Sequence, residues 1–131
     1  SVLIGDEDIM QNALRIRKIL GGGMRQVGYL AAAGLYALNN HMDRLAEDHL
    51  KAKEIEQLLS RLEFIKKVEP VETNIIIFEL LDKKNDSKFL KKLADKNIWL
   101  SNMGNGKLRV VTHLDYTEEM HDKFLTFLKN I

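Results

Sequence analysis

The chain has 131 residues, enough for one ordinary hydrophobic core, or for the end of one domain followed by a small second domain. Its formal net charge of +1, without a basic stripe that carries interleaved aromatics, argues against a non-specific nucleic-acid binder. No cysteine is present, which rules out disulfides in these residues and is typical of the cytoplasm, and no apolar run approaches the length of a transmembrane helix.

The first predicted elements are a short buried strand and a helix. Val2-Leu3-Ile4 is apolar enough for a buried strand, and such a strand needs neighbours on both sides. The residues that follow offer no partner, so we expect its sheet to be completed by residues outside this sequence. The next segment predicts a helix, because Asp6 or Asp8 can cap it and apolar residues then recur at helical spacing up to Leu20.

Gly21-Gly22-Gly23 separates this helix from a second helical region. Three consecutive glycines are costly in backbone entropy and make sense where the chain needs positive φ or a close approach. One interpretation is a helix C-cap and turn with two surface cations. The other is an anion site, in which Lys18, Arg25 and the N-terminus of the next helix meet a phosphate or carboxylate. The run matches neither the P-loop nor the dinucleotide-binding fingerprint.

The helical pattern then continues from Met24 to Leu62 without a clear stop. This length predicts either one domain-bridging helix or two helices that are broken near Asn39-Asn40. Charged residues crowd its second half on the face opposite the leucines. That pattern indicates a solvated helix surface.

The remaining residues alternate between strand and helix patterns. Strands are predicted at 64–68, 73–80, 98–100 and 108–112, with a turn at 102–106, and helices at 87–96 and after the cap Thr117. Ile76, Phe78 and Leu80 share one face of their strand. Trp99 and Tyr116 are interpreted as core and packing residues. The pattern predicts an antiparallel sheet with helices on one face.

Arg109 is the sharpest single candidate for chemistry. In a strand its side chain shares a face with Val111 and His113, so it sits among apolar neighbours and needs an anionic partner. An internal salt bridge is the alternative to a ligand. The histidines are too far apart in the sequence pattern to form a metal site, and His113 is expected to order the loop after its strand.

Two segments carry a family resemblance. The run RIRKILGGGMRQVGYLAAAGL from Arg15 to Leu35, and LRVVTHLD from Leu108 to Asp115, resemble the low-specificity threonine aldolases. These are pyridoxal phosphate (PLP) enzymes of the aspartate-aminotransferase fold type. The resemblance implies an α/β protein in which residues 1–45 end the PLP-binding large domain. Residues 46–131 would then form a small C-terminal α+β domain, whose antiparallel sheet is covered by helices.

The resemblance also implies roles for individual residues. Arg109 matches the arginine that holds the substrate α-carboxylate. Arg25 and Lys18 match the phosphate end of the cofactor site, partly across a subunit interface. The Schiff-base lysine of the family lies just upstream of the strand that Ser1–Gly5 resembles. We therefore expect a C-terminal fragment that contains no catalytic residue and has no aldolase activity alone.

The implied whole enzyme is a cytoplasmic homo-oligomer, a dimer or tetramer, that cleaves L-threonine or L-allo-threonine to glycine and acetaldehyde. PLP is its expected cofactor, with no metal and no nucleic-acid or membrane partner. Preference between the two threonine isomers depends on residues outside this stretch. Two alternatives stay open. One is a free-standing α+β anion-binding or regulatory domain, and the other is a PLP-dependent β-eliminating lyase relative.

Overall fold

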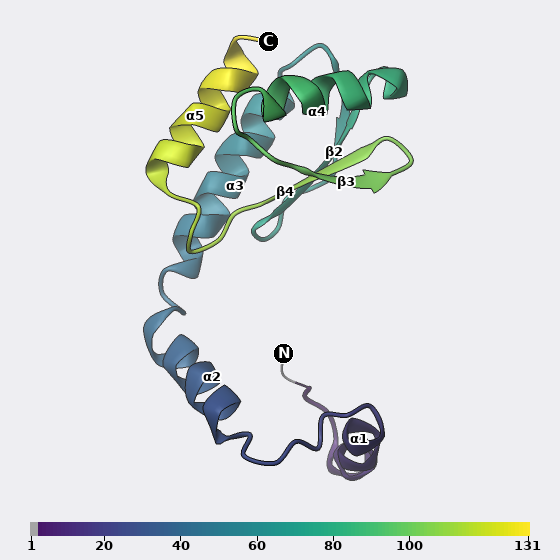
Figure 1. Ribbon diagram of the computed structural model, residues 1–131, viewed down its shortest axis with the longest axis vertical. Coiled ribbons are helices and arrows are strands. Elements are labelled where there is room, and N and C mark those ends of the chain that lie inside the picture. Colours follow the sequence, from purple (N-terminus) through teal and green to yellow (C-terminus); the bar gives the residue numbers. More distant parts are fainter. Residues whose placement is uncertain (1–2) are drawn as a thin grey trace. The chain divides into compact units, whose positions relative to one another are not determined.

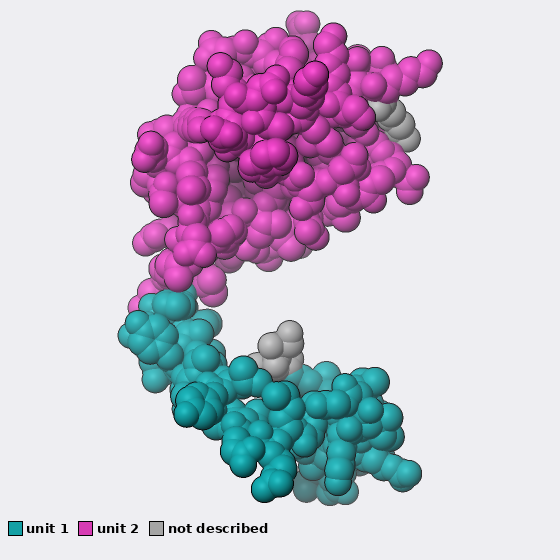
Figure 2. All heavy atoms as spheres, in the orientation of Figure 1, with its two compact units in different colours: residues 1–42 teal, residues 43–131 magenta. Residues whose placement is uncertain are grey.

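The computed structural model describes residues 3–131, apart from the side chain of Lys83. Figure 1 labels its helices and strands. The chain forms two compact units, Ser1–Met42 and Asp43–Ile131, which are coloured separately in Figure 2.

The first unit consists of two helices joined by the glycine turn. They are α1 (Glu7–Ile19) and α2 (Gly28–Asn40), and no residue of either helix is buried among the residues described. The helix predicted after Asp6 is confirmed as α1, and its N-cap is Asp6, although the Asp6 side chain makes no capping hydrogen bond. Acidic residues in the first turn and basic residues in the last turn favour the helix dipole.

The strand predicted at Val2–Ile4 is not found. Val2 lies outside the described residues, while Leu3 and Ile4 belong to no strand and are 66% and 89% exposed. A strand needs hydrogen bonds from a neighbouring strand, and the described part of this unit contains only helices and loops. Apolar composition alone therefore does not produce a strand here.

The long helical region is two helices, as the second of the two alternatives predicted. The first, α2, ends at Asn40, and α3 (Leu45–Leu59) begins after a turn. The side-chain amide of Asn40 donates to the Tyr36 carbonyl oxygen at 2.8 Å. Because such local bonds compete with the backbone hydrogen bonds of a helix, asparagine has a low helix propensity. The boundary between the two compact units, after Met42, falls in this turn.

The second unit is a four-stranded antiparallel sheet with three helices packed against it. Its strands are β1 (Ile65–Val68), β2 (Ile75–Leu80), β3 (Ser101–Gly104) and β4 (Lys107–Val111), in the order β1-β2-β4-β3. Besides α3, the unit contains the short 3-10 helix η1 (Lys83–Asn85), α4 (Asp86–Ala94) and α5 (Glu118–Lys129). Helices α3 and α5 lie side by side (Figure 1). The predicted α+β architecture is confirmed.

One hydrophobic core joins this sheet to all three helices. Side chains alternate along β2, so that Ile76, Phe78 and Leu80 are buried as predicted. The helices contribute Ala52, Ile55, Leu59, Phe89, Leu93, Phe124 and Leu128. Full burial of a large apolar side chain contributes about 1.5–3 kcal/mol, so this cluster is the main source of stability in the unit. No helix of this unit contributes a buried residue to the opposite face of the sheet in the part of the chain that the structure describes.

The strand predicted at 98–100 begins three residues later in the structure. The strand β3 begins at Ser101. The two-residue turn Asn105-Gly106 pairs Gly104 with Lys107, and an irregularity between Asn102 and Gly104 then shifts the register by one residue, so that Ser101 pairs with Arg109. Both turn residues have positive φ, 54° and 79°, as a type I′ turn requires. Before β3, Ile98 and Leu100 pack against the core. Trp99 points the other way and is 80% exposed, so its interpretation as a core residue is wrong.

Candidate functional site

Arg109 lies on the open face of the sheet. Its neighbours Leu108 and Val110 are buried in the core, and alternation along β4 therefore turns Arg109 to the opposite side. In register, Arg109 stands between Ile77 of β2 and Ser101 of β3. The guanidinium thus has an apolar neighbour on one side and a hydroxyl on the other.

The Arg109 side chain has no partner among the described residues. Its Nε–H group is buried and donates to no hydrogen-bond acceptor among the described residues, and no described acid forms an ion pair with the guanidinium. A buried donor that lacks its hydrogen bond costs about 1–3 kcal/mol, and more when the group is charged. The internal salt bridge that the sequence left open is therefore absent from residues 3–131. The arrangement is suited to an external anion.

A groove of about 690 Å³ opens beside this arginine. It is bounded by the residues before β3, by the end of β4 and by α5. Its lining includes Trp99, Ser101, Arg109, Val111 and His113. The groove is also lined by Lys123 and Glu119, so it combines two cations and one acid with apolar and hydrogen-bonding surface. A few polar groups in a mostly apolar lining are typical of a small-molecule site.

His113 orders the loop after β4, as expected from the sequence. Its Nδ1 accepts a hydrogen bond from the Asp115 backbone N–H at 3.2 Å, and the Asp115 carboxylate lies 4.0 Å from the same nitrogen. In the neutral ring the proton is then carried by Nε2. His113 thus fixes the Asp115 backbone through Nδ1, and the same residue lines the groove.

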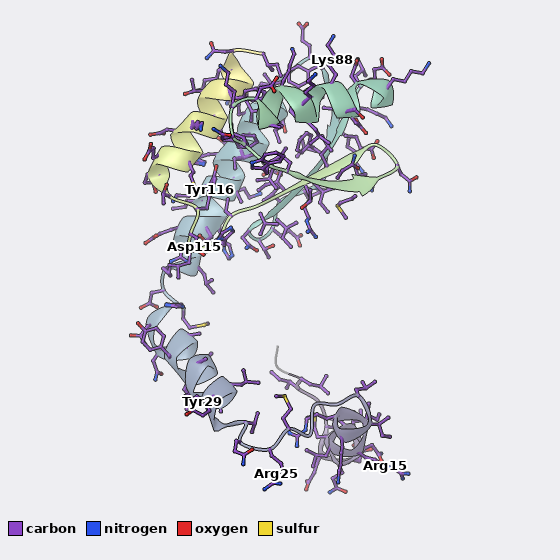
Figure 3. The ribbon with its side chains drawn as sticks, viewed as in Figure 1. Arg15, Arg25, Tyr29, Lys88, Asp115 and Tyr116 are labelled. Carbon is purple, nitrogen blue, oxygen red and sulfur yellow. The ribbon has the colours of Figure 1, made fainter. Side chains whose placement is uncertain are left out.

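A hydrogen-bonded chain that the sequence did not reveal fixes the wall of the groove. The Tyr116 hydroxyl lies 3.2 Å from Nδ1 of the buried His121, whose Nε2 lies 2.8 Å from the Glu54 carboxylate. Burial, with smaller contributions from the charges of Glu118 and Asp122, raises the pKa of Tyr116 well above its usual value. Tyr116, labelled in Figure 3, therefore keeps its proton at neutral pH and is a structural donor.

The end of β4 is tied to the start of α3. The Thr112 hydroxyl donates to the Asp48 carbonyl oxygen at 2.7 Å, and the Asn74 amide donates to the Thr112 carbonyl oxygen at 2.7 Å. The buried Asp48 carboxylate in turn accepts two hydrogen bonds from Arg44, at 2.8 and 3.0 Å. These bonds fix the strand that carries Arg109.

In the first unit, Gly21 ends α1 by a Schellman motif. The Gly22 N–H donates to the Arg17 carbonyl oxygen at 2.8 Å, and the Gly21 N–H donates to the Lys18 carbonyl oxygen at 3.2 Å. Gly21 has φ +84°, a conformation that side chains disfavour. The C-cap interpretation of the glycine run is therefore correct for its first residue.

The other two glycines allow close contact with the last turn of α1. A Cβ on Gly22 would lie 2.8 Å from Arg17 Cγ, and one on Gly23 would lie 3.1 Å from Lys18 Cγ. The stem of Lys18 thus rests against the turn. Arg25 follows in the loop, and its side chain extends away from both helices (Figure 3). Neither cation forms an ion pair with a described residue.

The N-terminus of α2 follows this turn and offers free backbone N–H groups. No side chain caps it, so its first backbone N–H groups receive no side-chain acceptor from the described residues. Arg25 lies three residues before Gly28, the first residue of α2. Two exposed cations next to a helix N-terminus suit an anionic group such as a phosphate.

Other kinds of site are not seen in the described part of the chain. No group of three or more metal-ligating side chains gathers among residues 3–131. None of the described helices is long and apolar enough to cross a membrane. The structure thus contains two separate candidate regions, the turn with Lys18 and Arg25 in the first unit and the Arg109 groove in the second.

Comparison with known proteins identifies the family. A family model described as "Beta-eliminating lyase" matches residues 1–83, and the chain belongs to that family. Curated relatives that match most of the chain are low-specificity L-threonine aldolases. The resemblance noted in the sequence is confirmed.

The relatives are proteins of plants, bacteria and fungi. Low-specificity L-threonine aldolase 1 of Arabidopsis thaliana is 37% identical over 120 residues, 89% of this chain and 34% of its own length. The low specificity L-threonine aldolase of Escherichia coli (strain K12) is 38% identical over 119 residues, 91% of this chain and 34% of its own length. The Candida albicans relative is 30% identical over 122 residues, 93% of this chain. The chain thus spans about a third of these relatives, in their C-terminal region.

Proposed function

We propose that this chain is the C-terminal part of a PLP-dependent aldolase that cleaves L-threonine or L-allo-threonine to glycine and acetaldehyde. The names of its relatives support this activity. The single structural observation that carries the proposal is the buried Arg109 Nε without a partner. We further propose that the whole enzyme is a cytoplasmic homo-oligomer, a dimer or tetramer.

Arg109 is proposed to hold the substrate α-carboxylate. A planar guanidinium can bind both carboxylate oxygens at once, and it stays charged at any working pH. Ile77 on one side and Val111 on the same face reduce the local polarity, which strengthens the attraction. Holding the carboxylate fixes the orientation of the Cα–Cβ bond that is to be broken.

Arg25 and Lys18 are proposed to hold the phosphate of PLP. Their unpaired charges and the uncapped start of α2 fit the anionic end of this cofactor. When bound, PLP supplies the electron sink that makes the Cα–Cβ cleavage possible. The residues of this chain contribute binding and orientation, and the boundary between large and small domain is proposed near residues 45 and 46.

The chain alone is predicted to lack aldolase activity. In the family that the sequence resembles, the Schiff-base lysine lies upstream of the segment matched by Ser1–Gly5. Purified chain incubated with PLP and L-threonine should therefore release no acetaldehyde in a coupled alcohol dehydrogenase assay. Acetaldehyde above the level of a PLP-only control would contradict this reading.

A chimera tests the proposed function itself. The chain replaces the matching C-terminal region of the Escherichia coli low specificity L-threonine aldolase, and PLP loading is read from absorbance. We expect acetaldehyde formation from L-threonine, with a large rise in KM for Arg109→Gln and weaker PLP retention for Arg25→Gln. A loaded chimera whose KM is unchanged by Arg109→Gln would contradict the carboxylate role.

The same chimera distinguishes a β-eliminating lyase, which the family description favours as the second candidate. Cleavage of L-threonine by an aldolase gives glycine and acetaldehyde. Elimination of its β-hydroxyl group would instead give 2-oxobutanoate and ammonia. Product analysis by NMR therefore decides between the two reactions.

A further inference from the structure

We propose that the Ser101 hydroxyl is a second donor to the carboxylate held by Arg109. The inference rests on the carboxylate role of Arg109 proposed above and adds a contact to that site. Its basis is the pairing of the two edge strands and the lining of the groove beside them.

The sheet register places Ser101 directly beside Arg109. The two residues are opposite each other on the antiparallel strands β3 and β4. Directly opposed residues have Cβ atoms about 4.5–5.5 Å apart and side chains on the same face. Both residues line the groove of about 690 Å³. A carboxylate bound by Arg109 from this side therefore lies within reach of the Ser101 hydroxyl.

The orientation of Ser101 follows from its neighbours. Ile98 and Leu100 pack against the core, so alternation along this extended segment turns Trp99 and Ser101 outward. On the other side of Arg109 the opposed residue is Ile77, which has no polar side chain. Of the two cross-strand neighbours of Arg109, Ser101 alone can donate to the ligand.

The Ser101 hydroxyl is available for this contact. Ser101 is exposed, and its hydroxyl makes no hydrogen bond to another described residue. The Arg109 Nε–H group also lacks a hydrogen-bond acceptor, although this atom is buried. A carboxylate has two oxygens and several lone pairs, so it can accept from a guanidinium and a hydroxyl together. Both unused donors would then be satisfied by one anion.

The groove also indicates where the rest of the ligand lies. Trp99, just before β3, and Val111, at the end of β4, both line the groove, whereas Ile77 does not. The ligand carbon chain would therefore extend along Val111 and Trp99. Because Trp99 is the single tryptophan of the sequence, its fluorescence reports on this position.

Carboxylate titrations of the full 131-residue chain test the proposal. Glycine and acetate are the probes, and binding is read from Trp99 fluorescence and from the ¹⁵N–¹H amide signals of β3 and β4. We expect Ser101→Ala to weaken binding about tenfold, the effect of losing one hydrogen bond to a charged group. Ser101→Thr, which keeps the hydroxyl, should bind like the wild type. Ser87→Ala, an exposed serine outside the groove, is the matched control and should have no effect.

The outcomes separate this inference from the function on which it rests. If Arg109→Gln abolishes binding while Ser101→Ala binds like the wild type, the Ser101 contact is refuted and the Arg109 site stands. If the wild-type chain shows no saturable response to either probe by fluorescence or NMR, the Arg109 site itself is refuted, and the Ser101 contact with it. Equal loss in Ser101→Ala and Ser101→Thr would also overturn the hydroxyl role.

Discussion

Thr112→Val should destabilise the second unit without disturbing its core. Thr112 is fully buried, and its hydroxyl donates to the Asp48 carbonyl oxygen at 2.7 Å. Valine has nearly the same volume, so no cavity forms, but the hydrogen bond is lost and a polar atom is left with one partner fewer. Such a loss costs about 1–2 kcal/mol. For a domain of roughly 60–100 residues this lowers Tm by roughly 4–16 °C.

Urea unfolding followed by circular dichroism measures this effect. The midpoint should fall while the slope m stays unchanged, because the surface exposed on unfolding is the same. Thr126→Val, an exposed threonine on α5, is the control and should change the free energy of unfolding by less than about 0.5 kcal/mol. Equal stabilities of Thr112→Val and Thr126→Val would refute the reasoning that the Thr112–Asp48 bond holds the end of β4.

Two further predictions concern acid stability and exposure. Hydrogen bonds from Lys53 and from the Val71 N–H lower the pKa of Glu56 below its ordinary value of 4.5. Glu56 therefore stabilises the folded state above pH 4.5, and this stabilisation is lost as the pH falls through the lower pKa of the folded state. The difference in unfolding free energy between wild type and Glu56→Gln should thus be full at pH 7 and disappear in strong acid; a difference independent of pH would contradict it. Trp99 fluorescence should be red-shifted and readily quenched by acrylamide, since this side chain is 80% exposed; a blue-shifted, shielded emission would show that Trp99 is buried.

Hydrophobic periodicity and capping residues predict most elements of the second unit. The alternation of Ile76, Phe78 and Leu80 and the cap at Thr117 each specify a local structure that the core then stabilises. The helix break near Asn40 was foreseen only as one of two alternatives, because weak helix formers do not always end a helix.

Pairing between distant residues was harder to predict. The start of β3 depends on the hairpin turn Asn105-Gly106 and on the register shift between Asn102 and Gly104, and apolar content alone placed the strand three residues too early. Leu3 and Ile4 form no strand in the structure. From the sequence we expected the neighbouring strands of this segment to lie outside these residues, and a strand does not form without such neighbours.

In the candidate site, too, local features were predictable from the sequence and contacts between distant residues were not. The position of Arg109 on one face of a strand follows from alternation, but its lack of an internal acid depends on the whole packed unit. The contact of His121 with Glu54 spans 67 residues of sequence and joins two helices. No local pattern signals such a contact.

The central claim is that Arg109 binds the carboxylate of an amino acid. Its most direct test is the ¹⁵N–¹H signal of the Arg109 Nε atom, assigned by its loss in Arg109→Gln, during titration with glycine and with ethanolamine, an amine without a carboxylate. The account predicts a saturable shift with glycine and none with ethanolamine. An Nε signal that stays fixed with glycine, or that responds equally to both compounds, would contradict it.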